Sequence, residues 1–247
     1  MTQLYPIGLF AAASAAPATG VKKTSSRGSK KQVAQQAIQY IMEHDKACYI
    51  TNKSSQAEKI ARIALDVGVK PEVIGAIIKQ ETHFSTNYKD MNKGRGTGPM
   101  QLVPITIHDM YIRPEAFDKS ISEYVGPKKK YKTFEEALKA KNKNQNINLG
   151  KFGNKFFELY KKNITYFEKG YYKAKKIPQD ILDQLRRTLS NNYELGVYLG
   201  CYTYKMKAQG ASNEQKALER YNTCSSKYVR EVSDTIAQVR RAYPQLK

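Results

Sequence analysis

The chain has 247 residues and is 40% hydrophobic, which is enough to bury one sizeable core. Lys and Arg outnumber Asp and Glu by 42 to 22, and the resulting charge of +20 predicts anionic partners such as cell-wall polymers, lipid headgroups or nucleic acid. Three cysteines are too few for a disulfide scaffold, no Cys/His cluster has metal-ligand spacing, and no segment is apolar enough to span a membrane. We therefore expect no metal, no cofactor and no transmembrane segment.

Residues 1–31 are predicted to lie outside the folded domain. Residues 4–16 are apolar and small, and 13–18 could hold a small-residue cleavage site, but no Lys or Arg precedes them as a secretory signal requires. Residues 17–31 are rich in Ala, Ser, Gly and Lys, which is typical of a linker. We interpret 1–31 as a disordered or processed leader and linker, with a signal peptide as the alternative, and 32–247 as the domain.

Three helices are predicted next, and the third delivers a carboxylate. Apolar residues recur at helical spacing within 32–47 and 55–67, and Gly68 ends the second helix. The third helix begins with Pro71, whose missing N–H is harmless in a first turn, and it runs to Glu81. A carboxyl group at the end of such an apolar helix can have its pKa raised by burial and still face a cleft, as a general acid requires.

A polar loop follows Glu81 and carries glycines at 94, 96 and 98, so we expect it to border a cleft. It ends in Gly98-Pro99-Met100-Gln101, and a helix is predicted over 100–110. Pro104 falls in the first turn of that helix, where proline is tolerated.

The block 112–190 is rich in Lys, Tyr, Phe and Asn and contains three helical segments, at 133–143, 150–162 and 178–189. Its lysine runs are consistent with solvated faces, but the interleaved tyrosines also suit a binding surface, because aromatic rings stack on sugars and on bases alike. No nucleic-acid-binding module is recognisable, so only the charge favours nucleic acid as a partner.

The C-terminal part predicts three more helices, from Asn192, from Ser212-Asn213-Glu214, and over 225–243. The last helix has an inward apolar face made by Tyr228, Val229, Val232, Ile236 and Val239. No alternating strand pattern of useful length occurs, so the predicted fold class is mostly α. Cys201 and Cys224 could lie close enough for a disulfide, although we favour three buried or inert thiols.

Four pieces of sequence, in this order, resemble the soluble lytic transglycosylase domain of the lysozyme-like superfamily. They are Glu81-Thr82, Gly98-Pro99-Met100-Gln101, Asn192-Tyr193-Glu194-Leu195-Gly196-Val197-Tyr198-Leu199 and Tyr221-Asn222. The resemblance covers about residues 56–104 and 190–241, and it implies a mostly α, lysozyme-like domain with a basic helical insertion at about 112–190. The run 146–150 resembles the third piece but lacks its tyrosine, so we prefer the copy that begins at Asn192.

The resemblance implies an enzyme that cleaves the β-1,4 bond between N-acetylmuramic acid and N-acetylglucosamine in peptidoglycan. Glu81 would act as a lone acid and then base, and the muramyl C6 hydroxyl would close a 1,6-anhydro ring. One alternative is a hydrolytic lysozyme of the same fold, with Asp90 as the better candidate for a second carboxylate. Another is a catalytically idle wall-binding or structural protein of a phage particle or secretion machine.

The resemblance also implies partners, location and substrate contacts. The partners would be glycan strands and other anionic envelope polymers, and the location the cell envelope, the periplasm, the exterior or a phage virion. The Thr82 hydroxyl would orient the Glu81 carboxylate, the Gln101 amide would reach N-acetyl or peptide-side groups, and the Tyr221 hydroxyl would point at Glu81 or the sugar. The implied substrate-binding residues are Thr82, Phe84, Gly98, Met100, Gln101, Tyr198, Tyr221 and Asn222; of these, Tyr198 would line the cleft floor and Asn222 would pin the local turn.

Overall fold

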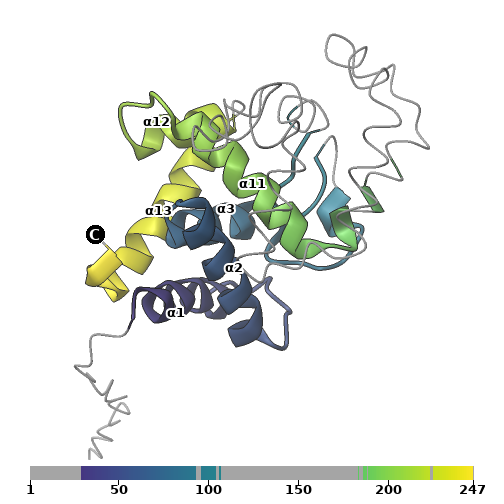
Figure 1. Ribbon diagram of the computed structural model, residues 1–247, viewed down its shortest axis with the longest axis horizontal. Coiled ribbons are helices and arrows are strands. Elements are labelled where there is room, and N and C mark those ends of the chain that lie inside the picture. Colours follow the sequence, from purple (N-terminus) through teal and green to yellow (C-terminus); the bar gives the residue numbers. More distant parts are fainter. Residues whose placement is uncertain are drawn as a thin grey trace, which may run out of the picture.

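The computed structural model describes residues 29–92, 96–103, 106, 183, 186–187, 189–222 and 225–246. These residues contain six α-helices and no β-strand, which confirms the mostly α class (Figure 1). Two short 3-10 helices occur as well, Asp90–Asn92 and Pro244–Leu246. None of the described helices is long and apolar enough to cross a membrane. The α-helices are α1 (Lys30–Glu43), α2 (Lys53–Val67), α3 (Pro71–Thr82), α11 (Tyr193–Ala208), α12 (Glu214–Tyr221) and α13 (Ser226–Ala242).

Helix α3 lies at the centre of the fold (Figure 1). Residues 71–78 are all buried, because this stretch is apolar around nearly its whole circumference and α1, α2 and α13 pack against it. Helix α11 packs against both α2 and α12. The centre of the core is therefore the helix whose last turn carries the candidate acid Glu81.

The helices begin where the sequence places capping residues. Asn192, Asn213 and Ser225 accept hydrogen bonds from backbone N–H groups in the first turns of α11, α12 and α13. Ser29 does the same for α1, which starts at Lys30, two residues earlier than predicted. The five residues predicted as the inward face of α13 are all buried, as expected.

The predicted helix over 100–110 does not begin at Met100. The backbones of Thr97 and Leu102 pair instead through two reciprocal hydrogen bonds of 2.9 Å, which close a tight turn over 97–102. Gln101 has a φ of 49°, and a right-handed helix cannot contain such a residue. The motif residues 98–101 therefore belong to a turn.

Several predictions fall outside the described residues. They are the leader 1–28, the helices at 133–143 and 150–162, most of the helix at 178–189, and the alternative run at 146–150. The disulfide between Cys201 and Cys224 is not formed, because Cys201 is a free, buried thiol. Burial also raises the pKa of Cys201 well above its ordinary value, which suits an inert core residue.

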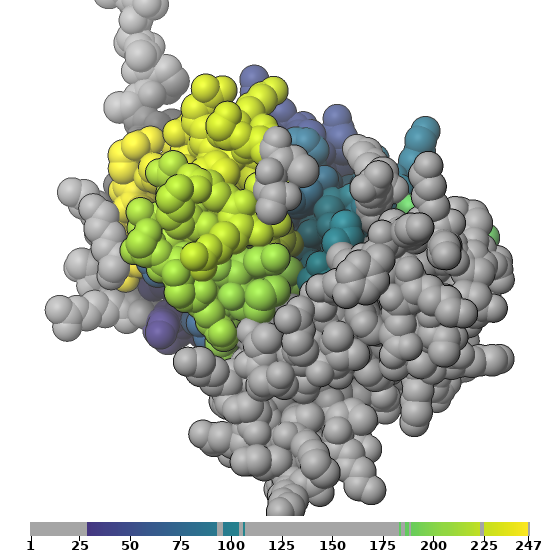
Figure 2. Space-filling view, turned by 90° about the horizontal axis from the view of Figure 1, so that it is seen from above, coloured from purple at the N-terminus to yellow at the C-terminus, as the bar shows by residue number. Residues whose placement is uncertain are grey.

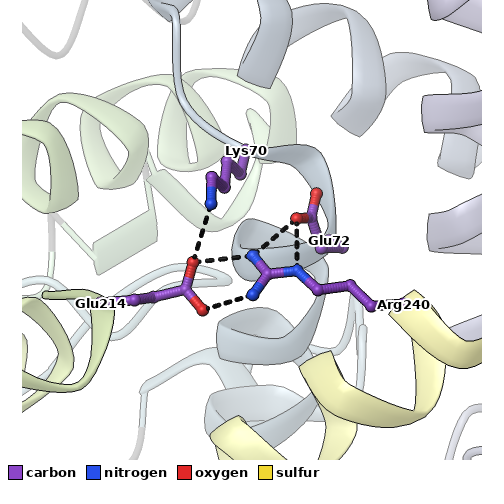
Figure 3. A network of polar contacts seen from close by, with 4 residues as sticks. All are labelled: Lys70, Glu72, Glu214 and Arg240. Carbon is purple, nitrogen blue, oxygen red and sulfur yellow. Dashed lines mark hydrogen bonds and ion pairs between the residues drawn. The ribbon is translucent and has the colours of Figure 1, made fainter. Parts of the chain in front are cut away.

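A partly buried ion-pair network joins α3 to the two C-terminal helices (Figure 3). The guanidinium of Arg240 donates to Glu72 through Nε at 3.1 Å and Nη2 at 2.8 Å, and to Glu214 through Nη1 at 2.9 Å and Nη2 at 2.8 Å. Lys70 adds an outer contact of 3.5 Å to Glu214. Because Glu72 is only 1% exposed, its charge depends on Arg240 for compensation.

Candidate active site

Glu81 lies in the last turn of α3, immediately before a sharp change of chain direction. His83 and Phe84 both have left-handed φ angles, 51° and 59°, which are rare for residues with side chains. Two contacts hold this bend: His83 Nδ1 lies 3.1 Å from a carboxylate oxygen of the buried Asp45, and the Phe84 ring is fully buried. The bend ends the helix just beyond Glu81 and so fixes where its carboxyl group emerges.

The environment of Glu81 makes it a stronger base than an ordinary glutamate. Burial raises the pKa of its carboxyl group from 4.5 to about 7, against the opposing effects of hydrogen bonding from Tyr228 and from Asn222. No ion pair involves Glu81 within the described residues. A half-buried carboxyl group with a pKa near 7 is both proton donor and proton acceptor at neutral pH.

Tyr228 of α13 was predicted only as a core residue, yet its hydroxyl faces the Glu81 carboxyl group. The ring is 7% exposed, and the hydroxyl oxygen has no partner at full hydrogen-bond geometry among the described residues. Burial, and then the negative charge of Glu81, raise the pKa of Tyr228 far above its ordinary value, so the phenol stays a proton donor. The sequence did carry one signal: a tyrosine on an otherwise aliphatic face needs a partner for its hydroxyl.

Asn222 is the second polar neighbour of Glu81. It is the C-cap of α12, and its backbone N–H bonds to Leu218 O at 2.9 Å, so it does hold the local turn. Its side chain also hydrogen-bonds to the Glu81 carboxyl group. The structure thus brings Asn222 and Glu81 together, although they are far apart in sequence.

Thr82 does not orient Glu81 through its hydroxyl. Its Oγ1 lies 3.0 Å from Pro99 O and 3.3 Å from Ile78 O, and the side chain is buried. A hydroxyl has one proton to donate, so Thr82 ties the end of α3 to the turn 97–102. It supports the site through the backbone rather than by touching the carboxylate.

The turn 97–102 is seated on α11 by two glycines of that helix. A Cβ atom at Gly200 would come within 2.2 Å of Met100 Sδ, and one at Gly196 within 2.5 Å of Pro99 Cδ. Only glycine permits this approach at either position. The Asn192 copy of the repeated motif therefore packs against Gly98-Pro99-Met100-Gln101.

Gln101 and Tyr221 also brace this turn. Gln101 Nε2 donates to Met91 O at 2.9 Å and to Gly98 O at 3.0 Å, so its amide hydrogens hold the loop instead of pointing outward. We expected the Tyr221 hydroxyl to point at Glu81 or the sugar, but it donates a hydrogen bond to Met100 O at 2.8 Å. The negative charge of Glu81 contributes, after burial, to the raised pKa of Tyr221, which places the two side chains near each other.

Four further candidates are buried or are engaged elsewhere. Phe84 and Tyr198 have no exposed surface, and Tyr198 packs against Tyr202 with ring centroids 5.6 Å apart, so both are core residues rather than contact residues. Met100 is likewise buried, at 1% exposure. Asp90 accepts a 2.9 Å hydrogen bond from Ser85 Oγ, which ties it to its own loop.

A cavity of about 450 Å³ lies between α12 and α13. Asn222 lines it and also bonds to Glu81, so the cavity and the carboxyl group share one side chain. In Figure 2 the teal surface around residue 100 lies beside, and set back from, the yellow-green surface of α12 and α13. A volume of this size is in the range of small-ligand sites.

Comparison with known proteins adds no relative: no protein-family model, curated protein or solved structure matches this chain. Within the part of the chain that the structure describes, no group of three His, Cys, Asp or Glu side chains could hold a metal ion. The chemistry of the site is therefore inferred from Glu81, Tyr228 and Asn222 themselves.

Proposed function

We propose that this chain cleaves the glycan strands of peptidoglycan as a lytic transglycosylase, with Glu81 as its single acid and base. The observation that carries the proposal is the pKa of Glu81, which burial raises to about 7. Acid–base catalysis is most efficient when the pKa lies near the working pH, because the group must both give and take a proton. The sequence resemblance supplies the substrate, and the site supplies a carboxyl group of suitable acidity.

The proposed reaction returns the proton to Glu81. In the first step the protonated carboxyl group gives its proton to the oxygen that bridges N-acetylmuramic acid and N-acetylglucosamine, and the C1–O bond of the muramyl sugar breaks. In the second step the Glu81 carboxylate takes the proton of the muramyl C6 hydroxyl, whose oxygen bonds to C1. The products are an N-acetylglucosamine hydroxyl and a 1,6-anhydro-muramyl end, with no water consumed.

The neighbours of Glu81 suit these two steps. Burial favours the protonated form that the first step needs, whereas hydrogen bonding from Tyr228 and Asn222 favours the carboxylate that the first step leaves behind. Because both groups come from the C-terminal helices, the packing of α13 on α3 and of α12 on α13 assembles the site. The ion-pair network of Arg240 holds that packing (Figure 3).

Transglycosylation is preferred over hydrolysis because of the state of Asp90. Hydrolytic glycosidases generally use two carboxyl groups, one of them to act as nucleophile or to activate water. Asp90 is bonded to Ser85, and no carboxylate of the described residues contributes to the pKa of Glu81. A nucleophile tethered to the reacting ring needs no second carboxylate to position it.

The test is the chemistry of the products. Purified peptidoglycan digested with the full chain should give muropeptides that are lighter by one water than hydrolysis products and resistant to borohydride reduction. Mass spectrometry before and after borohydride treatment measures both properties. Reducible muramic ends as the main product would instead identify a hydrolase, and intact glycan strands would favour the idle wall-binding alternative.

A further inference from the structure

The cavity between α12 and α13 is lined by charges of both signs. Ser226, Arg230 and Asp234 follow one another at four-residue intervals on α13, so they form a row on one face that spans about 12 Å. Arg230 and Asp234 are both exposed. A hydroxyl, a cation and an anion are therefore presented in sequence along one wall.

Neither charge is neutralised by another side chain of the described residues. Arg230 and Asp234 form no hydrogen bond or ion pair with any side chain in the described ranges, even though they lie one helical turn apart. An arginine that precedes its acidic partner along a helix has the less favourable orientation of such a pair. On the opposite wall Glu219 is already engaged by Lys216 at 2.7 Å. The cavity thus offers one unpaired guanidinium and one unpaired carboxylate to a ligand.

The lining argues against a sugar and for a short zwitterionic peptide. None of the described residues that line the cavity is aromatic, and its one aliphatic side chain is Val229, so it has no platform for stacking a sugar ring. A guanidinium pairs well with a carboxylate, and a carboxylate with an ammonium group. A span of about 12 Å matches roughly four residues of extended peptide.

We propose that this cavity binds the peptide stem carried by the muramic acid next to the cleaved bond, with Arg230 taking a stem carboxylate and Asp234 a stem ammonium group. The identity of the peptide rests on the proposed function. The position of the cavity supports it, because Asn222 both lines the cavity and bonds to Glu81, and a stem attached to the reacting sugar must leave the site beside Glu81. The enzyme would then select strands that carry peptides.

The experiment measures binding of the free stem peptide, released from purified walls by an amidase, to the full chain by NMR titration up to millimolar peptide. We expect saturable binding that Arg230→Gln and Asp234→Asn each weaken about tenfold, the loss expected for one charge-assisted hydrogen bond in an open cavity. Arg241→Gln is the matched control, since it removes the same charge from an exposed position of the same helix outside the cavity. It should change the affinity less than twofold.

Two outcomes overturn the proposal: no saturable binding of the peptide, or equal weakening by Arg230→Gln and Arg241→Gln, which would show that net charge alone attracts the peptide. Digestion of amidase-stripped glycan strands, run in parallel, keeps the two proposals separate. If stripped strands are cleaved to anhydro ends but the peptide does not bind, the proposed peptide site is wrong and the proposed enzymatic function stands. If the peptide binds in a manner that depends on Arg230 but strands are not cleaved, the peptide site stands and the proposed enzymatic function is wrong.

Discussion

The two ends of α3 each carry a glutamate, and their surroundings differ sharply. Glu72 in the first turn is 1% exposed and faces Arg240, which donates to it at 2.8 and 3.1 Å (Figure 3). Glu81 in the last turn is half-buried and faces an amide and a phenol, with no cation bound to it among the described residues. One helix therefore holds one carboxylate in a neutralised environment and another in an environment that disfavours its charge.

The comparison shows how burial produces either stability or reactivity. Where a cation accompanies the carboxylate, burial fixes the packing of α13 on α3 and leaves no group available for chemistry. Where none does, burial raises the pKa, and the proton becomes exchangeable near neutrality. Removing the Arg240 cation at one end should therefore lower the free energy of unfolding, whereas removing the Glu81 carboxyl group at the other end should raise it.

The largest effect is expected from Glu81→Gln on activity. The amide cannot donate an acidic proton or accept one, and the loss of such a group typically lowers the rate about 10³-fold. Release of soluble muropeptides from purified walls measures the rate, and circular dichroism checks the fold. Lysis by a folded Glu81→Gln protein at the parent rate would disprove the role of Glu81.

At the other end of α3, Arg240→Met should lower the free energy of unfolding, because Arg240 joins α3 to α12 and α13. It leaves Glu72 buried without its cation, and breaking a buried pair in this way costs about 3 kcal/mol, or about 10 °C in Tm. Thermal unfolding measures the loss. Lys31→Gln is the control, because its pair with Glu58 is exposed, and its Tm should match that of the parent within error.

In the same unfolding measurement, Glu81→Gln should raise the free energy of unfolding at neutral and alkaline pH, whereas Arg240→Met should lower it. The folded protein keeps the Glu81 proton up to about pH 7, whereas the unfolded chain releases it near pH 4.5, so stability falls as pH rises through this window. Without the carboxyl group, the free energy of unfolding no longer falls over this pH range, which corresponds to a difference of about 3 kcal/mol above pH 7. The variant should match the parent at pH 4 and exceed it at pH 8; equal curves at both pH values would mean that Glu81 is not buried as described.

The sequence predicts the elements of this comparison better than their contacts. Apolar spacing places α2 and α3, and the run from Pro71 to Glu81 identifies the carboxyl group at the end of a buried helix. The partnership of Glu72 with Arg240 joins positions 168 residues apart, which no local pattern encodes. Both ends of α3 were thus visible in the sequence, but only the structure shows which carboxylate is neutralised.

One error and one omission have the same origin in non-local packing. Helical propensity after Gly98 suggested a helix from Met100, but the pairing of Thr97 with Leu102 and the contact of Met100 with Gly200 stabilise a turn there. Helical spacing identified Tyr228 as buried, but spacing describes where a ring points and not what its hydroxyl meets. Residues that complete a site from a distant helix are invisible to such patterns.

Tyr228→Phe should produce a moderate effect that is specific to the Glu81 end. The Tyr228 hydroxyl lowers the pKa of Glu81, so its removal should raise that pKa further. Because the first step needs protonated Glu81, activity should fall above about pH 7 in the parent, and this alkaline limb should move upward by about half to one pH unit in the variant. Tyr202→Phe, which alters another buried tyrosine, is the control and should leave the alkaline limb in place.

The smallest effect is expected from Asp90→Asn, and it decides between the two chemistries of the site. The asparagine keeps an oxygen that can accept the hydrogen bond from Ser85, so the loop should be retained while the negative charge is lost. If the tethered C6 hydroxyl is the nucleophile, no second carboxylate is required, and the rate should change less than about twofold. If water is the nucleophile and Asp90 activates it, the rate should fall about 10²-fold or more, and the products of the parent should carry reducible muramic ends. A large loss together with reducible ends would show that the isolation of Glu81 from other carboxylates does not persist when substrate is bound, and that the site works as a pair.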